Sequence, residues 1–194
     1  MPAALLLAGG KSTRMGSSKA LLQWNGTPLV AHIATVLCEV ADPVIVVAAA
    51  DQKLPPLPSQ VEVAVDAQPD QGPLEAMSAG MRAVDGRAEV AFVSAVDVPL
   101  LRAEFVTAVI EALGGAQIAL PTEAGRDYYL AAAYRLELRG LVEQLLVSGE
   151  RRVGLLAERV PVNRIDAAEL PYPESLQNAN TPEQLEQLRS RQTA

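Results

Sequence analysis

Apolar and polar positions follow two periods along the chain, one typical of buried strands and one typical of helices. Segments in which apolar residues recur every three or four positions indicate helices, and they lie between short apolar runs of strand character. These runs are AALLLA at residues 3–8, PVIVVAA at 43–49, VEVAVD at 61–66, VAFVSAVD at 90–97 and AQIALP at 116–121. Strands that are apolar throughout are typical of a mostly parallel sheet covered by helices on both faces. The pattern predicts a single three-layer α/β/α domain over residues 1–194 with a mostly parallel (mixed) sheet.

The helical segments and the remaining strands are predicted from the same periods. In the first helix, Thr27 is placed to cap and Pro28 stands at the first helical position. Helices are predicted at residues 27–40, 73–84, 102–113, 136–147 and 182–189, and further strands at 128–135 and 159–166.

Composition narrows the class of ligand. The chain has 194 residues, 49% of them hydrophobic, and a formal net charge of -7, which argues against general nucleic-acid binding because that usually needs a basic surface. The charge is uneven, since no Asp or Glu precedes Glu39 while Lys11, Arg14 and Lys19 all fall in that segment. A local positive field on an acidic protein favours a small anionic ligand.

The single cysteine and the single histidine give no metal site or catalytic triad. Cys38 and His32 both lie in the first predicted helix, so we interpret Cys38 as a buried, unreactive thiol and His32 as a structural or surface residue. The amino-terminal apolar run has no basic region before it and is far shorter than the roughly 20 residues of a membrane span. We therefore expect a cytoplasmic protein without membrane or nucleic-acid partners.

The segment LLLAGGKSTRMGSSK at residues 5–19 contains Gly-Lys-Ser, which also ends the ATP-binding P-loop motif. A P-loop needs a glycine five positions before the Gly-Lys pair, and Leu5 occupies that position. We interpret the segment instead as another phosphate-binding loop, in which glycines expose backbone amides next to short hydroxyls and cations. A basic, solvent-exposed turn is the alternative.

Two aspartates are expected at one edge of the sheet. Ligands of α/β sheets bind outside the carboxyl ends of the strands, where Gly9, Asp66 and Asp97 each follow an apolar run. Asp97 is a candidate Mg²⁺ ligand, because this ion is usually bound by one or two carboxylates plus substrate phosphates; capping of the next helix is the alternative. Asp66 is expected to support the same cluster from the neighbouring strand or to bind the substrate.

Three further motifs carry candidate polar groups. Gly72-Pro73 stands at a helix start, where backbone amides can meet a base or phosphate, although Gly-Pro is also ordinary turn chemistry. In NANTPEQL at residues 178–185, Thr181 and Gln184 form a capping box, while the spacing of Asn178 and Asn180 puts both amides on one side of an extended segment. Arg151 and Arg152 in SGERRVGLL form either a solvated helix start or a second anion site.

Taken together, these motifs resemble those of the molybdenum cofactor guanylyltransferases, the MobA family of the Rossmann-like nucleotidyltransferase fold. The resemblance covers nearly the whole chain. Its motifs are LAGGKSTRMGSSK, GTPL, GPL, VDVPLL, GERRV and NANTPEQL, in this order.

The resemblance implies an Mg²⁺-dependent nucleotidyltransferase that transfers GMP from GTP to molybdopterin cofactor and releases diphosphate. It further implies transient contact with proteins that deliver or accept the cofactor. The resemblance assigns nucleotide binding to Leu7, Ala8, Gly9, Gly10 and Asp66, and phosphate binding to Arg14 and Lys19. It assigns both nucleotide and Mg²⁺ binding to Asp97, and ligand contact to Gly72 and Pro73. Asn178 and Asn180 are assigned to the pterin or metal side of the cleft. Gly10 favours GTP, because related cytidylyltransferases tend to have Leu-Ala-Ala-Gly where this chain has Leu-Ala-Gly-Gly.

The chain departs from the family pattern at three places. After the second strand, where the family often has an asparagine, this chain has Ala48-Ala49-Ala50. The GPL motif is followed by Glu75-Ala76 in place of Ala-Gly. The loop before Lys19 is one residue shorter than the family pattern. A related nucleotidyltransferase that uses CTP or a sugar-phosphate acceptor is one alternative function. A nucleotide-binding regulatory module without catalysis is the other.

Overall fold

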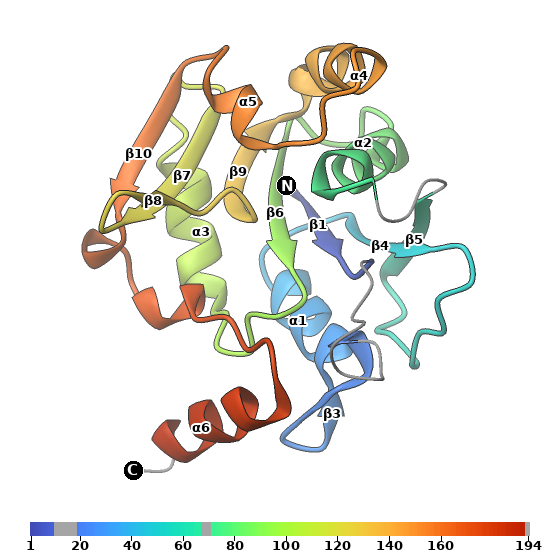
Figure 1. Cartoon of the computed structure of the whole chain (residues 1–194), viewed down its shortest axis with the longest axis vertical. Coiled ribbons are helices and arrows are strands. Elements are labelled where there is room, and N and C mark those ends of the chain that lie inside the picture. Colours follow the sequence, from blue (N-terminus) through green and yellow to red (C-terminus); the bar gives the residue numbers. More distant parts are fainter. Residues whose placement is uncertain (10–18, 67–70, 193–194) are drawn as a thin grey trace.

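The fold is built on one large mixed sheet (Figure 1). The computed structural model describes residues 1–9, 19–66 and 71–192, and within them this sheet has eight strands in the order β10-β7-β9-β6-β1-β4-β5, with β8 paired to β7. The strands are β1 Ala3–Leu7, β4 Val44–Ala49, β5 Val61–Asp66, β6 Val90–Ala95, β7 Ile118–Glu123, β8 Arg126–Asp127, β9 Ala131–Arg135 and β10 Val162–Asp166. The predicted strands are thus confirmed.

Parallel pairing brings several strand ends to one edge. Strand β1 pairs in parallel with β4 on one side and β6 on the other, and β4 pairs in parallel with β5. Strand β9 is antiparallel to both of its neighbours, β6 and β7. The expectation of a mostly parallel but mixed sheet is therefore confirmed.

Helices cover both faces of the sheet. The α-helices are α1 Leu29–Cys38, α2 Pro73–Val84, α3 Ala103–Glu111, α4 Arg139–Val147, α5 Gly154–Ala157 and α6 Pro182–Gln192, and the 3₁₀ helices are η1 Lys19–Leu21, η2 Leu136–Leu138, η3 Ala167–Glu169 and η4 Pro173–Leu176. Helices α1, α3 and α6 pack into one hydrophobic core and α2, α4 and α5 into the other. Three layers result, and their organisation as a single domain over residues 1–194 stays a prediction.

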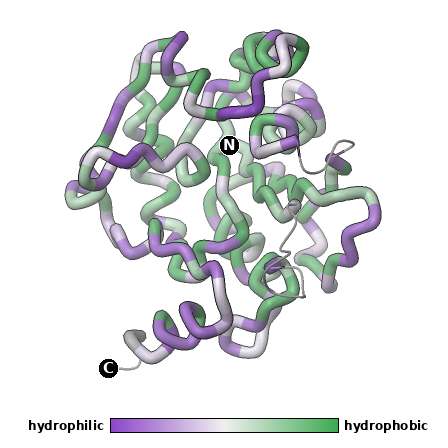
Figure 2. The backbone as a smooth tube through the Cα atoms, in the orientation of Figure 1, coloured by the Kyte–Doolittle hydropathy of each residue, from purple (hydrophilic) through white to green (hydrophobic). Residues whose placement is uncertain are grey.

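The alternation of side chains along β1 separates the two cores. Ala3, Leu5 and Leu7 pack on the side of α2, whereas Ala4 and Leu6 pack on the side of α1, as the two-residue period of a strand requires. Figure 2 shows the hydrophobic character of the central strands and the more hydrophilic character of α6. Across the described ranges, no helix combines the length and apolar character that crossing a bilayer would need.

The first helix begins later than predicted. Thr27–Pro28 form the short strand β3, which pairs antiparallel with β2 Gln23–Trp24. The intervening Asn25 and Gly26 have φ angles of 48° and 81°, and Asn-Gly is a favoured pair for such a tight hairpin turn. The predicted capping role of Thr27 and the first helical position of Pro28 are therefore wrong, because the hairpin incorporates both residues before α1 starts at Leu29.

Candidate active site

The carboxyl edge of the sheet brings together the predicted strand-end residues. Leu7 ends β1 and is followed by Ala8, Asp66 ends β5, and Asp97 follows β6 by two residues. Among these, Asp66 is only 5% exposed. Gly10 and Arg14, both predicted for the nucleotide site, lie outside the described residues, as does Lys11.

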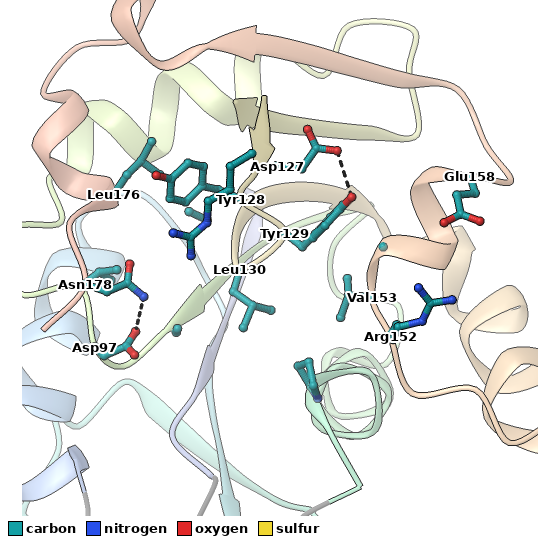
Figure 3. Close-up of a pocket in the computed structure, with 16 residues that line it drawn as sticks. Asp97, Asp127, Tyr128, Tyr129, Leu130, Arg152, Val153, Glu158, Leu176 and Asn178 are labelled. Carbon is teal, nitrogen blue, oxygen red and sulfur yellow. Dashed lines mark hydrogen bonds between the residues drawn. The ribbon is translucent and has the colours of Figure 1, made fainter. Parts of the chain in front are cut away.

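Asp97 is the centre of a polar cluster formed by segments far apart in sequence. Nζ of Lys19 donates to Oδ2 of Asp97 at 3.0 Å and to Oδ1 of Asn180 at 2.7 Å. Nδ2 of Asn178 donates to Oδ1 of Asp97 at 3.1 Å (Figure 3). The structure therefore joins the amino-terminal loop, the end of β6 and the segment before α6, all three of which the sequence singled out.

The segment that carries the two asparagines is anchored beside Asp97. Ala179 lies fully buried between them, and its backbone N–H donates to the carbonyl of Asp97 at 2.8 Å. Oγ1 of Thr181 then accepts the N–H of Gln184 at 3.2 Å, as in the predicted capping box. This cap fixes the start of α6 directly after the asparagines.

Asp97 does not cap the helix that follows it. Helix α3 begins at Ala103 after Arg102, without a side-chain cap. The carboxylate instead accepts hydrogen bonds from Lys19 and Asn178, with 13% of its side chain exposed. The helix-capping alternative is therefore wrong.

The expected proximity of Asp66 to Asp97 is also wrong. Their strands, β5 and β6, are separated by β4 and β1 in the sheet, which corresponds to about 14 Å across three strand spacings. A single metal ion cannot be bound directly by both carboxylates at that separation. The other expectation for Asp66, substrate binding, stays a prediction.

Gln52 occupies the strand end where the family asparagine is missing. The paired register of β1 and β4 ends at Leu7 and Val47, and the next rung of a parallel ladder would join the N–H of Ala49 to the carbonyl of Ala8. The Gln52 carboxamide lies in that place: Nε2 donates to the carbonyl of Ala8 at 2.9 Å, and Oε1 accepts from the N–H of Ala49 at 3.2 Å. No motif in the sequence indicates this role for Gln52.

Two motifs of the resemblance pack against each other near the start of α2. Gly72 has a φ of 94°, and a Cβ there would lie 3.3 Å from the carbonyl oxygen of Arg151. The Arg151 guanidinium donates to the carbonyls of Leu146 and Glu150 and to Oε1 of Gln71. Arg151 therefore connects the end of α4 to the loop before α2, while the second anion site stays a prediction.

A cavity of about 490 Å³ adjoins Asp97 (Figure 3). It runs from Asp97 and Asn178 past Tyr129 to Arg152, and Pro73 also lines it. The predicted residues Pro73, Asp97 and Asn178 thus share one cavity.

His32 and Cys38 lie away from this cluster. The His32 ring is hydrogen bonded through Nε2 to the carbonyl of Pro99 at 3.0 Å, and burial lowers its pKa. Burial raises the pKa of the Cys38 thiol, which disfavours the reactive thiolate. Within residues 1–9, 19–66 and 71–192, no group of three or more His, Cys, Asp or Glu side chains is placed to hold a metal ion.

Comparisons with known proteins agree with this architecture. A protein of Archaeoglobus fulgidus described as molybdopterin-guanine dinucleotide biosynthesis protein A superposes with a TM-score of 0.80, at 18% identity, over 98% of this chain and 98% of that one. The 2-C-methyl-D-erythritol 4-phosphate cytidylyltransferase of Thermus thermophilus superposes with a TM-score of 0.74, at 16% identity, over the whole of both chains. At these identities the similarity establishes the fold.

Closer relatives are found by sequence. A "Probable molybdenum cofactor guanylyltransferase" of Mycobacterium marinum is 38% identical over 188 residues, which is 88% of this chain and 92% of the relative. A protein of the same description from Mycobacterium tuberculosis is 40% identical over 172 residues, 86% of this chain and 84% of the relative.

The sequence relatives define the class of protein as a nucleotidyltransferase. The sequence profile of the MobA-like NTP transferase domain matches residues 4–162. The chain belongs to this family.

Proposed function

We propose that the chain is a molybdenum cofactor guanylyltransferase, which transfers GMP from GTP to molybdopterin cofactor and releases diphosphate. The observation that carries the proposal is the cluster of Lys19, Asp97, Asn178 and Asn180, which unites a cation, a carboxylate and two amides at the edge where α/β sheets bind ligands. Relatives of that description, 38–40% identical over most of the chain, support the choice of acceptor and nucleotide.

The nucleotide is assigned to the amino-terminal side of this edge. Leu7 ends β1 there and is followed by Ala8 and Gly9, and a Cβ on Gly9 would lie at an ordinary van der Waals distance, 3.8 Å, from the backbone nitrogen of Ala49. Gly10 and Asp66 are assigned to the nucleotide, and Arg14 to its phosphates. Gly72 and Pro73, at the start of α2, are assigned to the phosphate or acceptor side.

Asp97 is suited to bind Mg²⁺. Both of its carboxylate oxygens lie in the cluster, and Oδ1 of Asn180, which accepts from the same Lys19 ammonium group, lies in it too. Mg²⁺ retains several waters and is usually bound by one or two protein carboxylates together with substrate phosphates, so one carboxylate meets its requirement. When bound, the ion would neutralise charge on the GTP phosphates.

The reaction then needs positioning and charge stabilisation rather than a covalent intermediate. The terminal phosphate oxygen of molybdopterin attacks the α-phosphorus of GTP in line with the departing diphosphate. Lys19 donates hydrogen bonds to oxygens that gain negative charge, and Arg14 does the same from the preceding loop. Asp97 and Asn180, which hold the Lys19 ammonium group in this structure, keep it at the site before the substrate arrives.

A nucleotide panel with molybdopterin as acceptor tests the proposal by diphosphate release. GTP should be preferred to CTP, because a site built for the polar groups of guanine leaves them unpaired with the wrong base. Equal turnover of GTP and CTP would contradict the nucleotide assignment. Transfer to a sugar phosphate in place of molybdopterin would support the alternative enzyme, and GTP binding without any transfer would support the regulatory module.

A further inference from the structure

The cavity beside Asp97 extends away from the proposed nucleotide side. Asp97 and Asn178 stand at one end, and Tyr129, Val153 and Arg152 lie toward the other (Figure 3). Strand β8 and the segment after it supply one wall, while the segment entering α5 supplies the opposite wall. A molecule in this cavity would therefore lie against Asp97, where the proposed function places the nucleotide phosphates.

Tyr129 is held in a fixed orientation in the cavity wall. Its hydroxyl donates to Oδ2 of Asp127 at 2.9 Å, and Arg164 holds the same carboxylate at 3.2 Å. Its carbonyl accepts from the hydroxyl of Tyr134 at 2.7 Å, and Tyr134 is fully buried. Burial, followed by the hydrogen bond to Asp127, raises the pKa of Tyr129, so the phenol remains a neutral donor.

Gly154 makes room for the end of this ring. A Cβ at Gly154 would lie 3.3 Å from both Cζ and the hydroxyl oxygen of Tyr129, which is closer than ordinary van der Waals contact. The phenol is thus fixed between Asp127 and the backbone of Gly154. A rigid aromatic side chain binds a planar ligand with little loss of conformational entropy.

Two guanidinium groups in the same cavity are available for an anion. Arg126 and Arg152 come from different walls, and within the described part of the chain neither side chain has a carboxylate partner. The guanidinium of Arg126 lies 4.9 Å from the ring centroid of Tyr128. Glu158 also lines the cavity, whereas Asp97 and Asp127 are paired with Lys19 and Arg164.

We propose that this cavity is the acceptor subsite, in which Tyr129 supports the planar ring system of the acceptor and Arg126 binds its anionic part. The inference rests on the proposed function, because it assumes that a pterin phosphate is the acceptor. The apolar side chains of Val98, Leu130 and Val153 complete a lining suited to a flat heterocycle, and Asp97 lies where the acceptor phosphate meets the nucleotide.

Tyr129→Leu tests the ring contact, with Tyr172→Leu as the matched control. Stacking of a heterocycle on an aromatic side chain is lost on substitution at a cost of about 1–3 kcal/mol, so the KM for molybdopterin should rise on the order of 10- to 100-fold. The KM for GTP should stay within a few-fold, because the ring is remote from the nucleotide side. Tyr172 is 40% exposed and does not line the cavity, so its variant should match the parent.

A conservative variant separates ring support from a merely structural role. Tyr129→Phe loses the hydrogen bond to Asp127 but keeps the ring, so it should retain a KM for molybdopterin within a few-fold of the parent. Thermal unfolding of both Tyr129 variants reports any loss of fold. A KM change that follows the melting temperature, and is as large in Tyr129→Phe as in Tyr129→Leu, would overturn the proposal.

Binding of a simple pterin gives a measurement independent of turnover. Pterin-6-carboxylate, titrated by its fluorescence, should bind the parent more tightly than either Tyr129→Leu or Arg126→Ala, whereas Arg159→Ala, at an exposed position outside the cavity, should match the parent. Equal binding to all four proteins, or no binding to the parent, would overturn the subsite.

The two proposals fail in different ways. If the parent binds GTP with Mg²⁺ but transfers GMP to no pterin, the proposed function fails. If the parent transfers GMP to molybdopterin and Tyr129→Leu keeps the parental KM for it, only the acceptor subsite fails.

Discussion

Replacement of Lys19 by alanine tests the centre of the proposed site. The ammonium group of Lys19 donates to Asp97 at 3.0 Å and to Asn180 at 2.7 Å. Removing it eliminates one placed cation and leaves both acceptors without that donor. Lys53→Ala is the matched control, because Lys53 is exposed and stands after β4 on the surface.

The effect of this change on stability should be small. The Lys19 and Asp97 side chains are 28% and 13% exposed, which places the ion pair between a surface pair and a buried one. Surface pairs contribute up to about 1 kcal/mol, while breaking a fully buried pair costs about 3–5 kcal/mol. We expect a loss of roughly 1–2 kcal/mol in the free energy of unfolding, so the variant should fold.

The effect on turnover should be much larger. Loss of one preorganised donor at a developing negative charge lowers kcat on the order of 10²- to 10³-fold, equivalent to about 2.7–4 kcal/mol in the transition state. The KM for GTP should change less than kcat, because an interaction that strengthens in the transition state affects the rate more than ground-state binding. Lys53→Ala should stay within a few-fold of the parent.

The assay is steady-state diphosphate release with molybdopterin at saturating GTP and Mg²⁺, together with thermal unfolding of each variant. Lys11→Ala adds a second control, since the family pattern places Lys11 at a variable position. Equal losses in Lys11→Ala and Lys19→Ala would mean that general basicity, rather than one placed lysine, serves the loop. Turnover of Lys19→Ala within a few-fold of the parent would refute the role of the residue.

Three further predictions concern neighbouring features. Asp97→Asn keeps the side-chain size and removes the charge that would hold Mg²⁺. The variant should still bind GTP in calorimetry but lose turnover at every Mg²⁺ concentration. Parental turnover at ordinary Mg²⁺ concentrations would mean that Asp97 does not bind the metal. Gln52→Ala loses two hydrogen bonds of about 0.5–1.5 kcal/mol each, which should raise the KM for GTP several-fold. The control, Gln60→Ala at an exposed position, should leave the KM for GTP unchanged. Burial lowers the pKa of His32 below its ordinary value of 6.5, so the contribution of the neutral ring to the free energy of unfolding is complete above that pH and is lost as the pH falls. The parent should therefore lose more free energy of unfolding than His32→Gln between about pH 8 and about pH 5.5. Equal losses in the two proteins would count against the burial of the ring.

The positions of most strands and helices follow from hydrophobic periodicity. The apolar run at residues 3–8 became β1 because each face of that strand meets a different helical layer, and α2 has the predicted bounds of Pro73–Val84. The start of α1 was missed because Asn25-Gly26 forms a hairpin turn that withdraws Thr27 and Pro28 from the helix. Local turn chemistry thus competed with the helical pattern.

The order of strands in the sheet is harder to predict from sequence. Asp66 and Asp97 both end apolar runs, and both lie at the expected edge, but β1 and β4 separate their strands. Which strands become neighbours depends on how the crossover helices pack, and this information is not local. Hence the edge could be predicted, while the distance between two side chains on it could not.

The site residues differ in the same way. Asn178 and Asn180 could be found because the spacing of two in an extended segment places their amides together. Tyr129 and Gly154 could not, since their contact joins the end of the β8 hairpin to the start of α5. Tyr129 stood in an apolar run that predicted only a strand, and a single glycine before a short helix is typical of many loops.

Gln52 shows why comparison with a family motif, position by position, can miss a group that is present. The family pattern places an amide directly after the second strand, where this chain has three alanines. A glutamine side chain is long enough to reach back across a turn, and here the N–H of Gln52 bonds to the carbonyl of Ala49, which closes that turn. The carboxamide then returns to the N–H of Ala49 and the carbonyl of Ala8. An amide thus lies at the strand end although no motif position contains one, because side-chain length and turn geometry together determine where a functional group lies.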